Sequence, residues 1–338
     1  MKAFPHRLQA IAANRMNRNA EAITIFCSHL CVTEGINPLE PREWSELAQR
    51  LMDQGLQPES LLDYGQTDFA AHLGFSEEEA LRLVRLLDRS GSLRFELSKY
   101  EDMGIRVVTR ADASYPRQLK KKLGNACPPL FYCAGETELL NRPSVGYVGS
   151  RTVEAADIAF TQKIVATTAR KGYAVVSGGA KGIDSVSAAA ALSEGVSVIE
   201  YLSDSMMKKM RNADLMRDIR EGRILLLSPV APTAGFNVGI AMMRNRYIYA
   251  QSEGTVVVRS DKGKGGTWAG ATDNLKKGWC PTFCQDCDYP GNRELIRLGA
   301  IGITEDWDGC VDVPISKPEI QPKAEKKTST VQQLSLFD

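Results

Sequence analysis

Residues 174–194 read AVVSGGAKGIDSVSAAAALSE and contain three features that often occur together. Ala174 to Val176 is a short apolar run, Ser177 to Asp184 is a glycine-rich turn, and the segment that ends at about Glu194 has the length of a helix. An apolar strand that leads through a glycine turn into a helix is typical of sheets built from parallel strands. The stretch therefore predicts one strand–turn–helix unit of an α/β fold.

Similar apolar runs, separated by helix-length segments, recur on both sides of this unit. Several are apolar throughout rather than alternating, as expected of strands that are buried on both faces. This pattern predicts a doubly wound parallel sheet in residues 96–305, with ligands bound at the carboxyl ends of the strands where the strand order reverses. The predicted strands are Arg106 to Val108, Ser144 to Val148, Ala174 to Val176, Val196 to Tyr201, Ile224 to Leu227 and Thr255 to Val258.

Residues 1–95 have a different pattern and predict a small helical domain. Ala20 to Cys31 and Glu40 to Gly55 are the first two expected helices. Ser76 and Glu79 have the spacing of a capping box, which marks the start of a third helix. We expect a helical packing module here, with an independent DNA-reading unit as the less favoured alternative.

The composition excludes several classes of protein. The chain has 338 residues, and 42 Lys and Arg against 41 Asp and Glu give a net charge of +1, so the surface as a whole does not attract nucleic acid. Neither a membrane-spanning apolar run nor a secretory signal is visible, so we expect a soluble cytoplasmic protein with reduced cysteines. The three histidines all lie in the first 72 residues, which argues against histidine-based catalysis in the predicted sheet domain.

Four turns in the α/β region combine glycine or a polar residue with at least one cation. Backbone N–H groups at such turns, together with a helix N-terminus, can hold a phosphate group. We therefore predict a binding site for an anion, a nucleotide or DNA rather than four unrelated structural turns. The residues expected there are Gly149, Ser150 and Arg151; Ser177, Gly178, Gly179, Lys181 and Gly182; Arg244 and Arg246; and Lys264, Gly265, Gly266 and Thr267.

The order of several short motifs resembles the DNA-processing protein A (DprA/Smf) family over roughly residues 60–303. The motifs are Tyr115-Pro116, Pro128-Pro129-Leu130-Phe131-Tyr132, Val148-Gly149-Ser150-Arg151, Ser177 to Asp184, Arg244-Asn245-Arg246 and Glu294 to Ala300.

This resemblance implies a Rossmann-like fold and binding of single-stranded DNA in a basic pocket at the strand-end loops. It also implies a homodimer and transfer of the DNA to a RecA-type recombinase. Arg151, Lys181, Arg244 and Arg246 would then contact DNA, and Asp184 would fix the glycine loop by capping the following helix. No cofactor is expected.

The run Gly265-Gly266-Thr267 resembles nucleotide-processing relatives that include enzymes cleaving N-glycosidic bonds. This resemblance gives a second hypothesis for the function of the chain. Such an enzyme needs a carboxylate to polarise water or to stabilise an oxocarbenium ion. Glu200, Asp184 and Asp273 are the candidates near strand ends. A DNA glycosylase or nucleotide N-ribohydrolase is therefore the alternative to a binding protein.

The last residues form a segment of their own. Residues 306–330 are expected to be a flexible linker, and residues 331–338 to be a terminal peptide. Gln333, Leu334, Leu336 and Phe337 resemble the motif that docks in the bacterial sliding clamp, with the glutamine for hydrogen bonds and the apolar side chains as anchors. The alternative is a segment that folds back onto its own core.

Two further groups of residues have more than one reading. Cys280, Cys284 and Cys287, with Cys310, could hold zinc, but we favour buried or loop cysteines without metal because no second Cys-x-x-Cys pair and no histidine accompany them. Tyr147, Tyr247 and Trp268 are possible stacking partners for bases and equally possible core residues.

Overall fold

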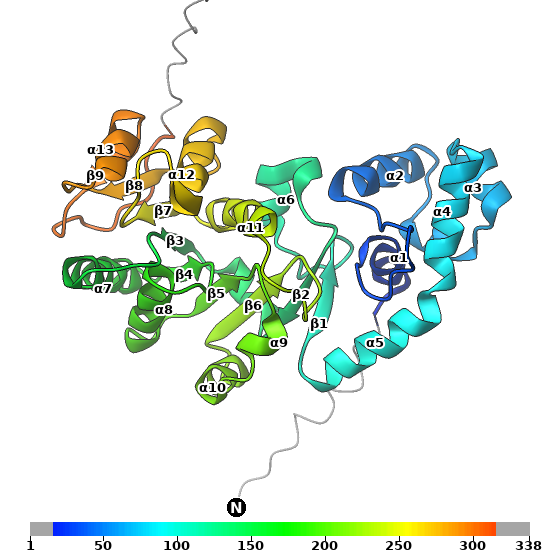
Figure 1. The fold of residues 1–338 in the computed structure, drawn as a ribbon, viewed down its shortest axis with the longest axis horizontal. Helices are drawn as coiled ribbons and strands as arrows, with labels where there is room; N and C mark the ends of the chain where they lie inside the picture. Colours follow the sequence, from blue (N-terminus) through cyan, green and yellow to red (C-terminus); the bar gives the residue numbers. More distant parts are fainter. Residues whose placement is uncertain (1–15, 316–338) are drawn as a thin grey trace, which may run out of the picture.

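The computed structural model describes residues 16–315, in which a nine-stranded sheet is covered by helices on both faces (Figure 1). Its strand order is β1-β2-β6-β5-β4-β3-β7-β8-β9. The predicted α/β class is confirmed. The strands are β1 (Arg106–Thr109), β2 (Leu130–Ala134), β3 (Ser144–Val148), β4 (Ala174–Ser177), β5 (Val198–Tyr201), β6 (Ile224–Ser228), β7 (Gly254–Val257), β8 (Thr282–Gln285) and β9 (Ile301–Ile303).

The sheet is mostly parallel, and its strand order reverses at β3. From β3, the chain adds β4, β5 and β6 on one side, and then returns to add β7, β8 and β9 on the other. The expectation of a wholly parallel sheet was wrong at one edge, where β2 pairs antiparallel with both β1 and β6. β2, β8 and β9 were not predicted as strands.

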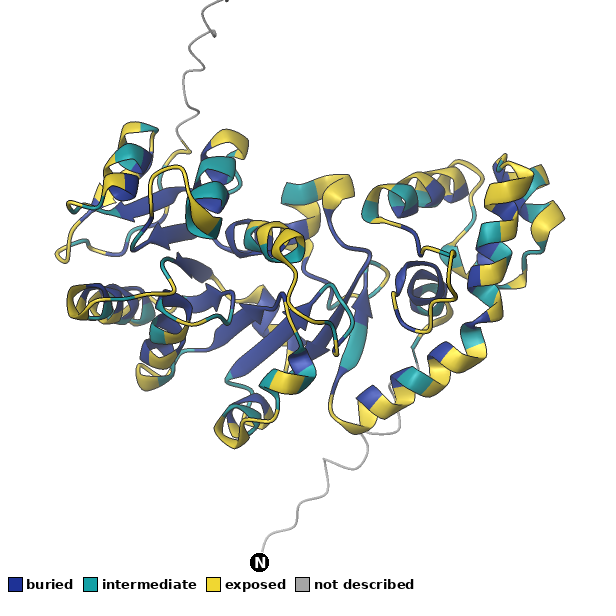
Figure 2. Cartoon of the chain, in the orientation of Figure 1, coloured by how far each residue is buried: buried dark blue, intermediate teal, exposed yellow. Residues whose placement is uncertain are grey.

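Two helical layers enclose the sheet, and strands β2 to β7 between them are buried, whereas the edge strands β1 and β9 are partly exposed (Figure 2). One apolar cluster joins the sheet to the layer with α7, α8, α9 and α10, and a second joins it to the layer with α6, α11, α12 and α13. These helices are α6 (Arg117–Leu123), α7 (Ala155–Arg170), α8 (Ile183–Ser193), α9 (Met206–Lys209), α10 (Ala213–Arg220), α11 (Val238–Gln251), α12 (Gly265–Lys277) and α13 (Pro290–Arg297).

The N-terminal helices form a module beside the β1 edge of the sheet (Figure 1). The predicted capping box is confirmed, because the Ser76 hydroxyl accepts from the Glu79 backbone and the Glu79 carboxylate accepts from the Ser76 backbone. The predicted boundary at residue 95 falls inside α5, which continues to Asp102. The helices are α1 (Arg18–Cys27), α2 (Pro41–Asp53), α3 (Gln66–Leu73), α4 (Glu77–Asp88) and α5 (Ser90–Asp102).

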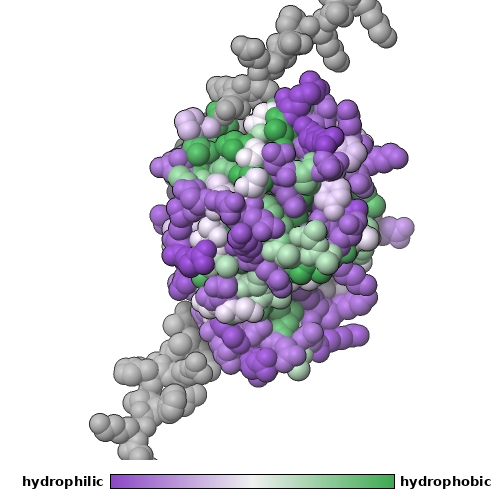
Figure 3. Space-filling model, turned by 90° about the vertical axis from the view of Figure 1, so that its left-hand side faces the viewer, coloured by the Kyte–Doolittle hydropathy of each residue, from purple (hydrophilic) through white to green (hydrophobic). Residues whose placement is uncertain are grey.

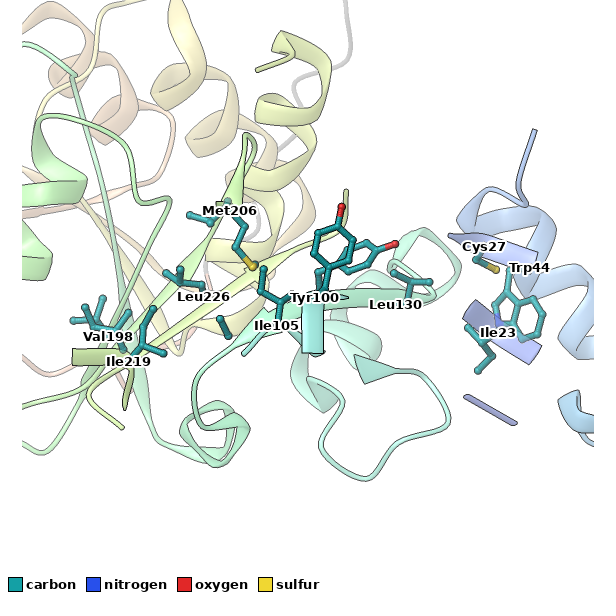
Figure 4. Close-up of a cluster of buried hydrophobic side chains, with 14 of the residues drawn as sticks. Ile23, Cys27, Trp44, Tyr100, Ile105, Leu130, Val198, Met206, Ile219 and Leu226 are labelled. Carbon is teal, nitrogen blue, oxygen red and sulfur yellow. The ribbon is translucent and has the colours of Figure 1, made fainter. Parts of the chain in front are cut away.

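The module and the sheet share one apolar cluster. Figure 4 shows this cluster, from Ile23 and Trp44 of the module to Leu226 and Val198 of the sheet. The Ser28 hydroxyl and the Tyr132 hydroxyl are 2.8 Å apart across the boundary, which adds a buried hydrogen bond. The module is therefore held against the sheet by continuous packing.

The C-terminal part of the described chain also packs on the sheet. Val311 is 3% exposed and belongs to the shared cluster, and the Trp307 and Phe283 ring centroids lie 4.7 Å apart. Residues 306–315 were expected to belong to a linker, but Trp307 and Val311 anchor this stretch to the core. The rest of the expected linker, and the clamp motif with Gln333 and Phe337, lie outside the described residues.

At the end of the molecule that carries α7 and α13, hydrophilic side chains cover most of the surface and hydrophobic ones form smaller areas between them (Figure 3). Within residues 16–315, none of the helices combines the length and apolar character that crossing a membrane requires.

Candidate functional site

A cavity of about 390 Å³ lies at the carboxyl ends of β3 and β7, beside the glycine loop that follows β4. This is the place where the strand order reverses, and it is where a doubly wound sheet commonly binds its ligand. The wall opposite the strand ends comes from α11. The predicted site residues in the lining are Gly149, Ser150, Arg151, Lys181, Arg244, Lys264, Gly265, Gly266 and Thr267.

The remaining residues of the glycine loop support the cavity from behind. A Cβ atom on Gly178 would lie 1.5 Å from Nη1 of Arg244, so only glycine leaves room for this guanidinium. Gly182 has φ +81°, and a Cβ there would lie 2.2 Å from the Ser150 carbonyl oxygen. Glycine at position 178 therefore leaves room for the Arg244 side chain, and glycine at position 182 allows the close approach of the loop after β3.

Asp184 holds the loop in this shape, but it does so differently from the expected helix cap. The N-cap of α8 is Gly182, and Asp184 lies inside the first turn. Oδ2 of Asp184 accepts hydrogen bonds from the backbone N–H groups of Gly178 and Ala180, each at 3.2 Å. Burial raises the pKa of this carboxyl, and the positive charge of Arg244 opposes the rise.

Arg244 is the most unusual group in the cavity wall. Its side chain is almost fully buried, its closest carboxylate oxygen is Oδ2 of Asp184 at 3.9 Å, and its Nε has no hydrogen-bond partner in the described chain. Tyr249 and Ser260 also line the cavity, and the hydroxyl oxygen of each is buried without a hydrogen-bond partner in the described chain. Buried polar groups are normally hydrogen-bonded, so these atoms indicate a polar ligand.

Three further cations surround the entrance of the cavity. Arg151, Lys181 and Lys264 are exposed, and none forms an ion pair with another described residue. Arg259 also lines the cavity, but Glu154 and Asp157 neutralise it through contacts of 2.7 Å and 3.1 Å. The unpaired positive charge is therefore concentrated on flexible side chains that can reach an anion.

Sequence reasoning missed an apolar border on this cavity. Phe236 is 53% exposed, and the Arg151 guanidinium lies 5.4 Å from its ring centroid. Val238 and Met242 are exposed beside it in the same lining. The signal in the sequence is an isolated phenylalanine in a loop rich in glycine and proline, where no neighbouring apolar residue predicts burial.

Three predicted candidates, Arg246, Asp273 and Glu200, lie outside this cavity. Arg246 projects from another face of α11 into a separate cleft, where its Nε is 2.9 Å from Oδ2 of Asp273. Glu200 is buried beneath the glycine loop, and its Oε2 lies 2.5 Å from Nζ of Lys209. The three carboxylates proposed for glycosidic cleavage are therefore in different places, and only Asp184 lines the cavity.

Two of the three aromatic residues considered as stacking partners are buried in the core. Tyr147 and Tyr247 are buried, so neither can stack on a base, whereas Trp268 is half-buried against the second apolar cluster.

No group of three or more potential metal ligands was found among residues 16–315. Of the cysteines considered for zinc, Cys284 and Cys287 both contact Asn292, whereas Cys280 lies beside Thr255.

Comparison with known proteins gives consistent matches. The family described as DNA recombination-mediator protein A matches residues 106–312. DNA processing protein DprA of Bacillus subtilis (strain 168) is 29% identical over 224 residues, which cover 64% of this chain and 74% of the relative.

Two solved structures have a similar fold. DprA from Streptococcus pneumoniae superposes with a TM-score of 0.62 at 21% identity, covering 78% of this chain and 95% of the other. DprA from Helicobacter pylori, whose structure is described for its single-stranded DNA binding mode, gives a TM-score of 0.50 at 25% identity. That match covers 59% of this chain and 90% of the other.

Proposed function

The chain belongs to the DNA recombination-mediator protein A family, and on this basis we propose that the cavity at the ends of β3 and β7 binds single-stranded DNA. The observation that carries the proposal is the buried guanidinium of Arg244, whose Nε has no partner in the described chain. A phosphate oxygen would supply the missing acceptor and compensate the buried charge. The binding mode of the Helicobacter pylori relative supports the choice of ligand.

The surrounding side chains divide the proposed contacts between phosphates and bases. Arg151, Lys181 and Lys264 would neutralise phosphates at the entrance, and the exposed ring of Phe236 offers a face for a base. Stacking of a base on an aromatic side chain contributes about 1–3 kcal/mol and tolerates any sequence. The binding we propose is therefore dependent on salt, largely independent of sequence, and requires no chemical step.

The test is fluorescence anisotropy with a labelled single strand and a labelled duplex at several salt concentrations. Because one phosphate contact on a single strand contributes about 0.7 to the slope of log K against log salt, Lys181→Glu is expected to lower that slope by about this amount and to weaken binding. Arg85→Glu makes the same charge change on exposed α4, away from the cavity, and should bind as the unmodified protein does. Equal affinity of Lys181→Glu and Arg85→Glu would contradict the proposal.

No cleavage of an N-glycosidic bond is proposed. Lys209 neutralises Glu200, Arg246 pairs with Asp273, and two backbone N–H groups hold Asp184. Each carboxylate thus has a structural role. The family match favours DNA binding over this alternative.

We also propose that the terminal peptide docks on the bacterial sliding clamp. Gln333, Leu334, Leu336 and Phe337 supply a hydrogen-bonding side chain and apolar anchors. Truncation after Thr330 is expected to abolish clamp binding in a surface-plasmon-resonance assay, while thermal melting stays unchanged. Retained clamp affinity would exclude this role for the peptide.

The family resemblance also supports three broader proposals. They are transfer of the strand to a RecA-type recombinase, homodimerisation, and a role in recombination, repair or defence at the replication clamp. A cytoplasmic location stays a prediction from the sequence.

A further inference from the structure

A second cleft, of about 550 Å³, lies on the other side of α11 from the strand-end cavity. Its walls come from the start of α2, the end of α6, α11, and the end of α12 with Trp279. Figure 1 shows α6 between α11 and the helical module, so this cleft lies where the two parts of the molecule meet. Arg246, which the sequence placed with the strand-end residues, lies here.

The cleft carries an excess of positive charge. Arg42, Lys122, Arg246 and Lys277 line it, opposed by the carboxylates of Glu40 and Asp273. Of these four cations, only Arg246 forms an ion pair within the described residues. The rest of α6 adds Arg117, Lys120 and Lys121, all exposed, so a protein with a net charge of +1 concentrates cations on this face.

Tyr247 lines this cleft, although its ring packs against Phe131 and Tyr201 in the core. Tyr247 is 1% exposed, and its Oη has no hydrogen-bond partner in the described chain. Lys122 is partly buried, and its Nζ donates to the Ser252 carbonyl oxygen at 2.8 Å. The cleft thus combines a partly buried ammonium group with cations that have no carboxylate partner among the described residues, and this favours an anionic ligand.

The cleft and the strand-end cavity are both lined by residues of α11. Met242 lines the cavity and Met243 lines the cleft, and both side chains are more than a third exposed. A helix with its side chains is about 10–12 Å across, which a short stretch of nucleic acid can span. The exposed thioethers offer apolar contact to bases of a strand that crosses this helix.

We propose that a single strand held in the strand-end cavity continues across Met242 and Met243 into the second cleft, where Arg42, Lys122 and Lys277 bind its phosphates. This inference rests on the proposed function, since it extends the path of the same ligand. Single-stranded DNA fits better than an acidic peptide because α11 forms a wall of both the cleft and a cavity suited to phosphates. The cleft thus makes affinity dependent on the length of the strand.

The test compares single strands of about 6 and about 20 nucleotides, within the range of lengths that single-strand-binding domains occupy. The double variant Arg42→Glu with Lys277→Glu is expected to bind the short strand as the unmodified protein does. It should bind the long strand roughly tenfold more weakly, with a salt slope lower by about 1.4, because two phosphate contacts are lost. The control is Lys276→Glu with Arg85→Glu, which reverses two exposed cations outside the cleft, one of them in the same turn of α12.

The outcomes separate this inference from the proposed function. If the double variant and the control bind the long strand equally well, the strand does not enter the cleft, although the strand-end site can still stand. If the unmodified protein fails to bind the short strand, the proposed function itself fails. Thermal melting of both double variants shows whether they fold as the unmodified protein does. A loss of affinity without a change in melting temperature is then due to the lost contacts.

Discussion

Because Gly178 has no side chain, the guanidinium of Arg244 can lie directly against it. Nη1, Cζ and Nη2 of Arg244 would all lie within 2.6 Å of a Cβ atom on this residue. The same glycine donates its backbone N–H to Asp184, so one residue sets the position of both charges in the buried pair. The local sequence thus determines the electrostatics of the cavity through steric exclusion.

Gly178→Ala is therefore expected to displace Arg244 and to leave Asp184 with weaker compensation. Loss of such a buried contact costs about 1–3 kcal/mol in the free energy of unfolding, and single-strand affinity should fall with it. Thermal melting and anisotropy measure the two effects.

Gly91→Ala provides the matched control, because no atom lies within 4 Å of a Cβ built at this helical position. It should be neutral or slightly stabilising, since alanine is the better helix former. If Gly178→Ala resembles Gly91→Ala in both measurements, contact with Gly178 does not hold Arg244 in place.

At the scale of elements, the sequence predicts the strand-end loops well. It predicts α11, which lies between the strand-end cavity and the second cleft, poorly. Strand–turn–helix units carry apolar runs and glycines at recognisable places, so the loops after β3, β4 and β7 were found from the residues alone. Arg244 and Arg246 are two positions apart on α11, which places them on different faces. The sequence motif therefore assigned both arginines to one site, whereas the helix directs them to two different sites.

Other elements escaped prediction because their signal depends on partners distant in the chain. β2 pairs antiparallel with β1 and β6, and neither pairing can be read from five apolar residues. Phe236 borders the cavity only because the loop before α11 passes over Arg151. Such contacts follow from tertiary packing, which overrides local preference.

At the scale of the whole molecule, a nearly neutral chain gathers cations on one edge of the sheet and on the adjoining face. Elsewhere many charged side chains are paired, as in Arg82 with Glu43 and Lys163 with Glu305. This distribution favours local recognition of phosphates over general attraction to nucleic acid. The helical module contributes to that face through the start of α2.

The central claim is that a single strand lies in the strand-end cavity, and photocrosslinking tests it most directly. A single strand of about 6 nucleotides, suited to one binding site, carries a photoreactive thymidine analogue and is irradiated on the full chain. Mass spectrometry of the peptides is expected to find adducts at Phe236, Val238 or Met242, or in the loop with Gly149 to Arg151. Adducts confined to the helical module, with none in these segments, would contradict the claim.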